Sequence, residues 1–494
     1  MRKVFPVVAF VVFSLSLIVA TFWYAPSWGL MDDAQNLIFA ESLKQQSDPL
    51  HYIWKNSMAA GWFRPVYFYW VALMYHLFKD APTLFYVAVI LMNMTALLMW
   101  GIVFREFFAV REDDLYLTVF LFPLSFFLFT PFWNIFMYLS PQEKFIVFFT
   151  PCALYLFKKS YDRNNGWLLI GAVAIAILGI YSKPTGIFLP CLFVVFSLTD
   201  LMFLKVRQRI SILSLIINTV LIIAYTIFTF KVQLNWSYTA GYKENLSAGL
   251  MLSRIFNGPL FIKFLFLAGL IVFLFLIIKA VCFKDKYKAL QSLIPLGLIA
   301  YVILLTPWGY QSYLLCALPP FVLGTFFPIY DWVNRSHDIL SRTMNGGLFI
   351  LLGIVYIWII IPRISTIADI AKTEKYMENS HPQEKNDRYF MAHGCPEAAF
   401  ALGKFTGQDT VYLSGNTLAQ PMLNTEERNY LLVNYLCRVG SLQDIRLDQE
   451  VYSNNTWKII EVKAEDGCQG SFALEFPKGP IARIKDFLRD FRYF

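Results

Sequence analysis

The chain has 494 residues, of which 57% are hydrophobic, 18% are aromatic and only 15% are charged. Soluble globular proteins carry about 25% charged residues, so this composition excludes an ordinary soluble protein and indicates a membrane protein. The net charge of +8 is therefore expected to set membrane orientation and to contact lipid headgroups rather than to bind nucleic acid.

Long apolar segments recur along the chain and predict a polytopic helical bundle. A membrane-spanning helix needs about 20 apolar residues, and about eleven segments approach that length. The first is expected to stay on the chain, because Phe22, Trp23 and Tyr24 stand where signal cleavage needs small residues. The expected spans lie near residues 4–22, 83–103, 115–130, 145–157, 167–180, 187–203, 211–230, 260–282, 290–306, 313–330 and 346–362.

Basic residues are concentrated in alternate connections between these segments. Lys and Arg are enriched in short cytoplasmic loops, so the basic set predicts a cytoplasmic N-terminus in the cell (inner) membrane. Residues 1–362 would then form the multi-pass transmembrane domain, and residues 363–494 an extracytoplasmic domain. The basic set comprises Arg2, Lys3, Arg105, Arg111, Lys158, Lys159, Arg163, Lys205, Arg207, Arg209, Lys284, Lys286, Lys288, Arg335 and Arg342.

Residues 65–78 are apolar but too short to fit this pattern as an ordinary span. As a helix they would reach about 21 Å, against a hydrocarbon core of about 30 Å. Counting them as a span would also invert every later connection. We expect an amphipathic helix at the outer interface, where its aromatic residues and His76 suit the depth. A short tilted span is the alternative.

The first outer loop opens with two adjacent carboxylates, Asp32 and Asp33. Like charges beside a low-dielectric surface raise the pKa of at least one partner, which makes it a candidate general base. Either residue could instead cap a helix over Ala34–Lys44, and the two interpretations are compatible. The loop ends at Arg64, which can bind a lipid phosphate bidentately or can simply reach the interface as a lone Arg.

The later outer loops add further polar and aromatic side chains at the same boundary. Glu143 and Lys144 stand at the mouth of one expected span, and Lys183 lies in a very short loop between two others. A Lys so close to hydrocarbon usually has a phosphate or carboxylate partner, although plain anchoring remains possible. Trp308 and Tyr310 occupy another outer loop and could stack on a sugar. Together these residues suit a lipid-phosphate donor with a polar headgroup.

The tail after residue 362 is more charged than the preceding region. Alternating apolar residues predict strands at Thr410–Leu413, Trp457–Val462 and Ser471–Leu474. Helices are expected at Glu427–Tyr435 and, as a basic amphipathic segment, at Ile481–Phe494. We therefore expect a small α/β or α+β soluble domain, which either helps to hold an acceptor or is structural.

Motifs for nucleotide, dinucleotide or serine-hydrolase chemistry are missing from the sequence. The five His residues have no metal-ligand spacing, so neither a metal nor a cofactor is predicted. Cys395, Cys437 and Cys468 lie in the tail, where an oxidising compartment would permit one disulfide. The sequence leaves the pairing open.

Over about residues 1–200, the chain resembles the GT-C superfamily of polyprenyl-phosphate-sugar-dependent glycosyltransferases, which includes protein O-mannosyltransferases and lipid A aminoarabinose transferases. Asp32 and Asp33 match the acidic pair after the first span of that family. Arg64–Phe78 matches its interfacial helix. Glu143 matches a second acidic position and is the third expected catalytic residue, although Asp is commoner there and Lys144 follows here. The resemblance implies an all-α GT-C-like bundle with interfacial helices in the first outer loop.

The resemblance also implies a mechanism. Asp32 would activate an acceptor hydroxyl or amine with support from Asp33, while Arg64, Lys144 and Lys183 would bind the donor phosphate. The sugar would transfer with inversion to a glycan, lipid or protein, and a monophosphate would leave without an obligatory metal. Two other functions are alternatives: a polyprenyl-linked oligosaccharide flippase or transporter, and an O-antigen polymerase or ligase. Transporters usually place ionisable groups at the bilayer midplane, where this sequence has few.

Overall fold

The structure is a computed structural model in which helices precede strands. Every regular element described up to residue 355 is helical, and strands follow from residue 388. The structure describes residues 4–24, 39, 42–43, 46–59, 64–78, 81–110, 112–129, 132, 134–137, 142–231, 248–305, 315, 317–336, 338–355, 372–373, 388–391, 409–412, 417–419, 429–434, 438–439, 445–453, 457–464 and 471–475.

Six helical segments of the described chain are long and apolar enough to cross a membrane. This composition marks the chain as a membrane protein, whereas the count of eleven spans stays a prediction. The six contain α1 (Val4–Tyr24), α5 (Pro82–Phe108), α9 (Phe188–Thr199, with its flanking turns), α10 (Gln208–Lys231), α13 (Leu260–Phe283) and α14 (Lys286–Leu305).

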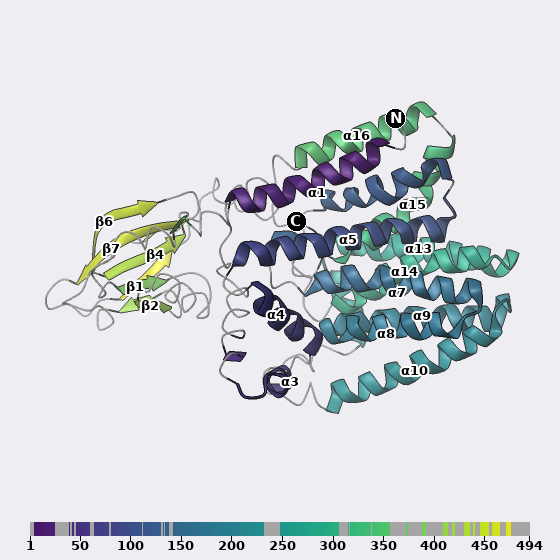
Figure 1. Cartoon of the computed structure of the whole chain (residues 1–494), viewed down its shortest axis with the longest axis horizontal. Helices are drawn as coiled ribbons and strands as arrows, with labels where there is room; N and C mark the ends of the chain where they lie inside the picture. Colours follow the sequence, from purple (N-terminus) through teal and green to yellow (C-terminus); the bar gives the residue numbers. More distant parts are fainter. Residues whose placement is uncertain are drawn as a thin grey trace.

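Four further helices accompany these six. In Figure 1 the long helices of the bundle run roughly side by side, with α7 and α8 between α5 and α10. The apolar helix α8 is shorter than the six, and α7 carries charged residues at both ends. The four are α7 (Glu143–Arg163), α8 (Gly166–Ser182), α15 (Pro319–Ser336) and α16 (Asp338–Val355).

The segment expected to span at 115–130 is not a regular α-helix. A short turn, η1 (Glu112–Asp114), precedes a π-helical turn, η2 (Leu117–Leu121), and a 3₁₀ segment, η3 (Phe122–Leu128). Pro123 has no N–H to donate to Val119 four residues earlier, so that α-helical hydrogen bond is missing there. Gly101 of α5 packs directly on this stretch, since a Cβ at Gly101 would lie 2.4 Å from the Val119 carbonyl oxygen.

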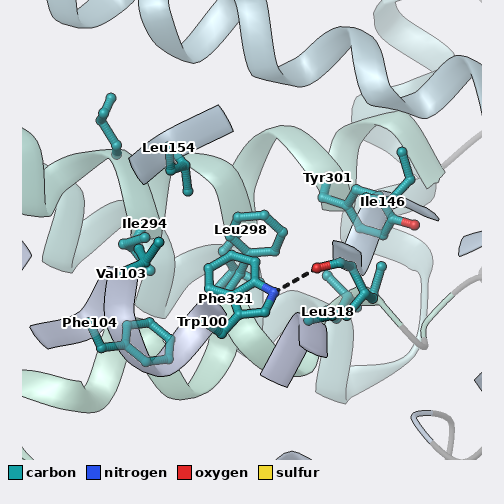
Figure 2. Packing of buried hydrophobic residues seen from close by; sticks show 14 of the residues in the cluster. Trp100, Val103, Phe104, Ile146, Leu154, Ile294, Leu298, Tyr301, Leu318 and Phe321 are labelled. Carbon is teal, nitrogen blue, oxygen red and sulfur yellow. Dashed lines mark hydrogen bonds between the residues drawn. The ribbon is translucent and has the colours of Figure 1, made fainter. Parts of the chain in front are cut away.

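An aromatic core holds α5, α7, α14 and α15 together (Figure 2). The buried ring of Trp100 meets Phe321 edge to face, with 5.3 Å between centroids. The indole nitrogen of Trp100 donates to the Val147 carbonyl at 3.0 Å. That carbonyl lacks its usual helical donor, because the residue four positions later is Pro151. Trp100 therefore satisfies a buried acceptor that the α7 sequence creates.

The interfacial helix predicted over residues 65–78 is present as α4 (Pro65–Phe78). It is not among the candidate spans, and in Figure 1 it is tilted against the long helices at one end of the bundle, near α3 (Pro49–Ala59). Pro65 occupies the first helical position, where a missing N–H costs nothing. Its placement at a lipid interface stays a prediction. The remaining short helices are α6 (Asn134–Met137) and α12 (Ala248–Asn257).

The strands form a five-stranded sheet in the order β2-β1-β4-β7-β6 and a three-stranded sheet in the order β3-β8-β5. Figure 1 shows the larger sheet beyond the end of the bundle where α3 and α4 lie. The pairings of β1 with β2 and β4 are parallel, and the others are antiparallel. The strands are β1 (Arg388–Met391), β2 (Asp409–Tyr412), β3 (Thr417–Ala419), β4 (Asn429–Asn434), β5 (Arg438–Val439), β6 (Ile445–Ser453), β7 (Trp457–Ala464) and β8 (Ser471–Glu475).

These strands correct one expectation for the tail. The helix expected at Glu427–Tyr435 is wrong, because Asn429–Asn434 is a strand. Pairing on both sides, with β1 and β7, overrides the local preference of this segment. The three runs predicted as strands coincide with β2, β7 and β8. The expected helix at Ile481–Phe494 and the tail cysteines lie outside the described residues, so the class and boundaries of the soluble domain stay predictions.

Candidate functional site

The first turn of α7 buries two adjacent charged side chains. Glu143 and Lys144 are the first two residues of the helix, with 1% and 0% of their surface exposed. A carboxylate in the first turn interacts favourably with the positive end of the helix dipole. Burying an isolated charge costs several kcal/mol, so each group needs a partner in the protein or in a ligand.

Lys183 reaches this point from the end of α8. It precedes Pro184, which disfavours helical backbone at Lys183, and the residue is extended with φ −150° and ψ 125°. The following turn presses on α8, since a Cβ at Gly186 would lie 2.7 Å from a Gly179 backbone atom. Held in this way, Lys183 places its Nζ 2.6 Å from Oε1 of Glu143.

Helix α4 packs against the first turn of α7. Arg64 directly precedes this helix and is buried, and its carbonyl accepts a bond from the Phe68 N–H at 3.2 Å. Trp70 packs edge to face on Phe145 with 5.5 Å between ring centroids. The Nζ of Lys144 lies 5.0 Å from the centroid of Trp70. A desolvated cation over an aromatic face gains about 2 kcal/mol.

The structure pairs Glu143 with Lys183 and places Lys144 over Trp70 of α4, the helix that Arg64 directly precedes. We call the four predicted site residues Arg64, Glu143, Lys144 and Lys183 the site end of the bundle. Three are basic and one is acidic, and all four are buried. Two helices, α4 and α7, also begin here with their positive dipole ends. Such a set of groups suits an anion with several oxygen atoms, such as a phosphate.

The other predicted site residues lie outside the described residues: Asp32, Asp33, Trp308 and Tyr310. Trp70 is a contact residue that the sequence interpretation missed. Trp70 lies three residues after Tyr67, so both rings are on one face of α4, and both pack on Phe145. This spacing is the sequence signal that could have identified Trp70. Within the described residues, no group of three or more His, Cys, Asp or Glu side chains is placed to hold a metal ion.

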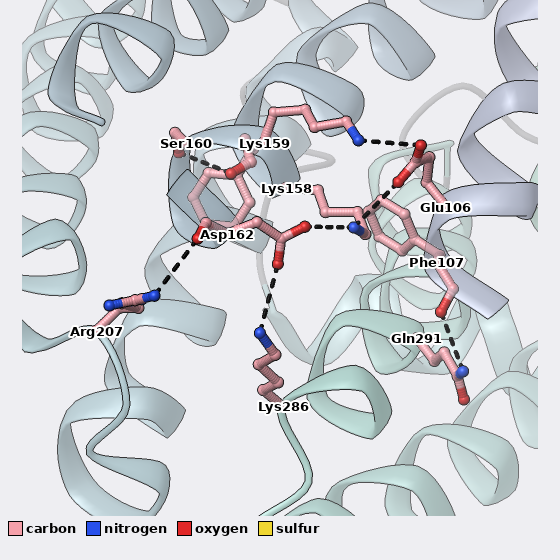
Figure 3. A network of polar contacts seen from close by, with 10 residues as sticks. Glu106, Phe107, Lys158, Lys159, Ser160, Asp162, Arg207, Lys286 and Gln291 are labelled. Carbon is pink, nitrogen blue, oxygen red and sulfur yellow. Dashed lines mark hydrogen bonds and ion pairs between the residues drawn. The ribbon is translucent and has the colours of Figure 1, made fainter. Parts of the chain in front are cut away.

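A second polar cluster lies at the other end of α7 (Figure 3). Lys158 pairs with Glu106 of α5 at 3.2 Å and with Asp162 at 2.5 Å, while Lys159 pairs with Glu106 at 3.0 Å. Lys286 at the start of α14 lies 3.7 Å from Asp162. We call these five residues the network end. They link α5, α7 and α14, and their basic members belong to the connections predicted to be cytoplasmic.

Asp200 completes this end of the bundle through four hydrogen bonds to its buried carboxylate. Its carboxylate accepts from the hydroxyls of Tyr161 at 2.7 Å and Ser211 at 2.6 Å. It also accepts from the backbone N–H groups of Val206 at 3.0 Å and Arg207 at 3.2 Å. The turn between α9 and α10 is thus fixed to α7 by one buried carboxylate.

No family model matches the chain, and no curated protein matches it. The class that the fold defines is a membrane protein with several apolar helices. The site end adds a buried, mostly basic cluster at one end of that bundle.

Proposed function

We propose that this protein is an inverting glycosyltransferase that moves a sugar from a polyprenyl-phosphate donor to an acceptor on the outer face of the membrane. The observation that carries the proposal is the buried pair of Lys183 with Glu143, together with two further buried basic residues: Lys144, beside Glu143 in α7, and Arg64, which precedes α4. Basic groups that meet near lipid favour a phosphate, and a sugar phosphate on a lipid places that phosphate at this depth.

The length of α7 supports the placement of the site end at a membrane boundary. From Glu143 to Asp162 the helix rises about 28 Å, close to the hydrocarbon thickness of about 30 Å. Charged side chains mark both ends, while Phe145–Phe157 between them is mostly apolar. This spacing favours α7 as a span, and it supports the proposed eleven-span arrangement with the site end outside and the network end inside.

Residue roles follow from the chemistry of a single displacement. The acceptor O–H or N–H attacks the anomeric carbon, the bond from that carbon to the phosphate oxygen breaks, and configuration inverts. Asp32 takes the acceptor proton with support from Asp33. Lys144, Lys183 and Arg64 stabilise the charge on the leaving polyprenyl phosphate. Trp308 and Tyr310 hold the sugar, membrane lipids surround the bundle, and the acceptor is a glycan, lipid or protein.

The positions of buried charges favour this reaction over a flippase or transporter. In the described chain the buried charged residues are Arg64, Glu143, Lys144, Lys158, Lys183 and Asp200. All of these lie near helix ends or in connections, whereas coupled transporters place ionisable groups near the midplane. The buried polar pair at the middle of α10, Asn218 and Ser214, is uncharged. A polymerase or ligase acting on the same lipids is the nearer alternative.

The direct test replaces the proposed base. We expect Asp32→Asn to lower sugar transfer in isolated membranes by about 10²–10⁴-fold, the usual contribution of a general base, and Asp33→Asn to lower it less. Asp48→Asn is the matched control, because Asp48 lies in the same loop and caps α3 by accepting from the His51 N–H, a role that Asn can keep.

The readout pairs this transfer assay with mass spectrometry of lipid extracts from a deletion strain. Lipid-linked sugar should accumulate in that strain and should fall again when the wild-type chain is restored. Equal transfer by all three variants at equal expression would remove these carboxylates from the mechanism. A lipid profile unchanged by deletion would remove the polyprenyl donor.

A further inference from the structure

The exposure of the ion pair at the site end is uneven. The Glu143 side chain is 1% exposed, whereas that of Lys183 is 10% exposed. An acceptor cannot reach the carboxylate in this arrangement, so Glu143 is poorly placed to take a proton from substrate. An anion arriving from the exposed side would meet the Lys183 ammonium first.

We propose that Glu143 holds Lys183 in the place of the donor phosphate, and that the two anions exchange on Lys183 when donor binds and when product leaves. The proposal rests on the function proposed above, and it makes Glu143 a positioning residue instead of a base. A carboxylate oxygen and a phosphate oxygen present the same acceptor chemistry to an ammonium group. Each can therefore occupy the contact that now measures 2.6 Å.

Exchange is favoured over sharing because two anions on one buried ammonium repel each other strongly in a low dielectric. Glu143 also has a second source of stabilisation. It lies in the first turn of α7, where the free N–H groups and the helix dipole favour a negative charge. These interactions offset part of the cost when the carboxylate gives up Lys183.

The exchange would set the affinity of the protein for the donor before the reaction and for the product after it. The donor phosphate must compete with Glu143 for Lys183, which lowers its affinity. The product polyprenyl phosphate carries more negative charge than the donor and would otherwise be held more tightly. The return of Glu143 to Lys183 favours its release. Lys144 remains over Trp70 throughout; because it is fully buried, it attracts the phosphate through the low-dielectric surroundings without touching it.

Three variants of the full chain in lipid nanodiscs test the exchange, with inorganic phosphate and a synthetic polyprenyl monophosphate as probes. E143Q should bind both probes about tenfold more tightly, because the competing carboxylate is gone. K183M should bind them at least about tenfold more weakly. The double variant E143Q/K183M should bind as weakly as K183M. E112Q is the matched control, since Glu112 is exposed in η1 and should leave binding unchanged.

Kinetics separate this role from a catalytic one. For E143Q we expect the donor KM to fall and inhibition by polyprenyl phosphate to strengthen, with kcat changed by less than about tenfold. A large fall in kcat at unchanged KM would make Glu143 a catalytic residue and would overturn the exchange. If E143Q does not fold, E143D is the second variant, because it keeps the charge on a shorter side chain. Its affinity for the probes should lie between those of the wild type and E143Q.

The outcomes also distinguish the two proposals. If the wild type binds the probes but E143Q binds them equally or more weakly, the exchange on Lys183 is wrong while the sugar-transfer proposal survives. If the wild type binds neither inorganic phosphate nor polyprenyl monophosphate, the proposed function fails and the exchange fails with it.

Discussion

The two ends of α7 arrange charged side chains in opposite ways. At the network end, Glu106 and Asp162 share three lysines, and each cation meets a carboxylate from its own helix or a neighbour. The site end has one carboxylate for three buried basic residues, and the Nζ of Lys144 lies over the ring of Trp70. The network end connects helices to one another, whereas the site end gathers cations at one place.

This difference separates structural charge from functional charge. Charges that form closed networks with several partners fix helix positions, and a change there should alter stability. We propose that the mostly basic cluster beside two helix N-termini binds an anion, so a change there should alter binding and rate. Each prediction below breaks or sharpens that comparison, beginning with the largest expected effect.

The comparison requires that the two ends lie on opposite sides of the membrane, which cysteine labelling tests. In a cysteine-free chain, S47C lies beside α3 near the site end and R163C lies at the end of α7; both positions are exposed. An impermeant maleimide should label S47C in intact cells, and should label R163C only after permeabilisation, an all-or-none difference. Labelling of both positions in intact cells would contradict the opposite placement.

Replacing one lysine at each end should separate rate from structure. K183M should lower sugar transfer at least about 100-fold, because it removes charge stabilisation from the leaving phosphate. K159M should change transfer less than about fivefold, since Lys159 is partly exposed and makes a pair of the kind that contributes little. Initial rates in membranes, normalised to the amount of folded protein, measure both. Equal losses would show that the two ends do not differ in this way.

Removing the buried carboxylate of Asp200 should act on stability alone. Asp200→Asn keeps one acceptor oxygen but points its amide NH2 group at hydroxyl or backbone donors. The free energy of unfolding should fall by about 2–3 kcal/mol. Asp285→Asn is the control, because Asp285 caps the start of α14 and Asn caps equally well. Unfolding in mixed detergent micelles gives the free energies. The donor KM should be unchanged in both, and a raised KM in Asp200→Asn would connect this turn to the site.

The sequence predicted the site end better than the network end, for a physical reason. Pro65 and the change from apolar to charged residues after Phe78 set the bounds of α4 directly. Loop sidedness then placed Glu143 and Lys183 at one boundary, but it could not show that they pair. Side-chain pairing depends on how each helix is rotated about its axis. Hydropathy cannot show that rotation when a membrane helix is apolar on all faces.

The network end was predicted only as a set of basic loops. Hydropathy ended the span at residue 157, yet α7 continues to Arg163, because Glu106 and Asp162 satisfy the lysines of its last turns. A charged stretch resembles a loop when its partners are distant in sequence. Asn429–Asn434 was mistaken for a helix for a related reason, since its partners β1 and β7 are also non-local.

The smallest expected effect concerns the contact of α5 with α7. Trp100→Phe removes the indole donor from the Val147 carbonyl and leaves a buried acceptor unsatisfied, which should cost about 1–2 kcal/mol. Pro151→Ala restores an N–H four residues after Val147, so in that background the same change should cost less. A coupling of about 1 kcal/mol in the double-mutant cycle, measured by micelle unfolding, is the expected result.

Loss of ring packing alone would give a different result in this cycle. The contact between Trp100 and Phe321 is present in both backgrounds, so a packing effect would make the two changes additive. Additivity would therefore show that the hydrogen bond contributes little and that α7 is held by the aromatic core. Coupling would show that Pro151 leaves the Val147 carbonyl without its helical donor, and that Trp100, 47 residues earlier in the chain, supplies a donor instead. In that case a single directional bond links α5 to α7.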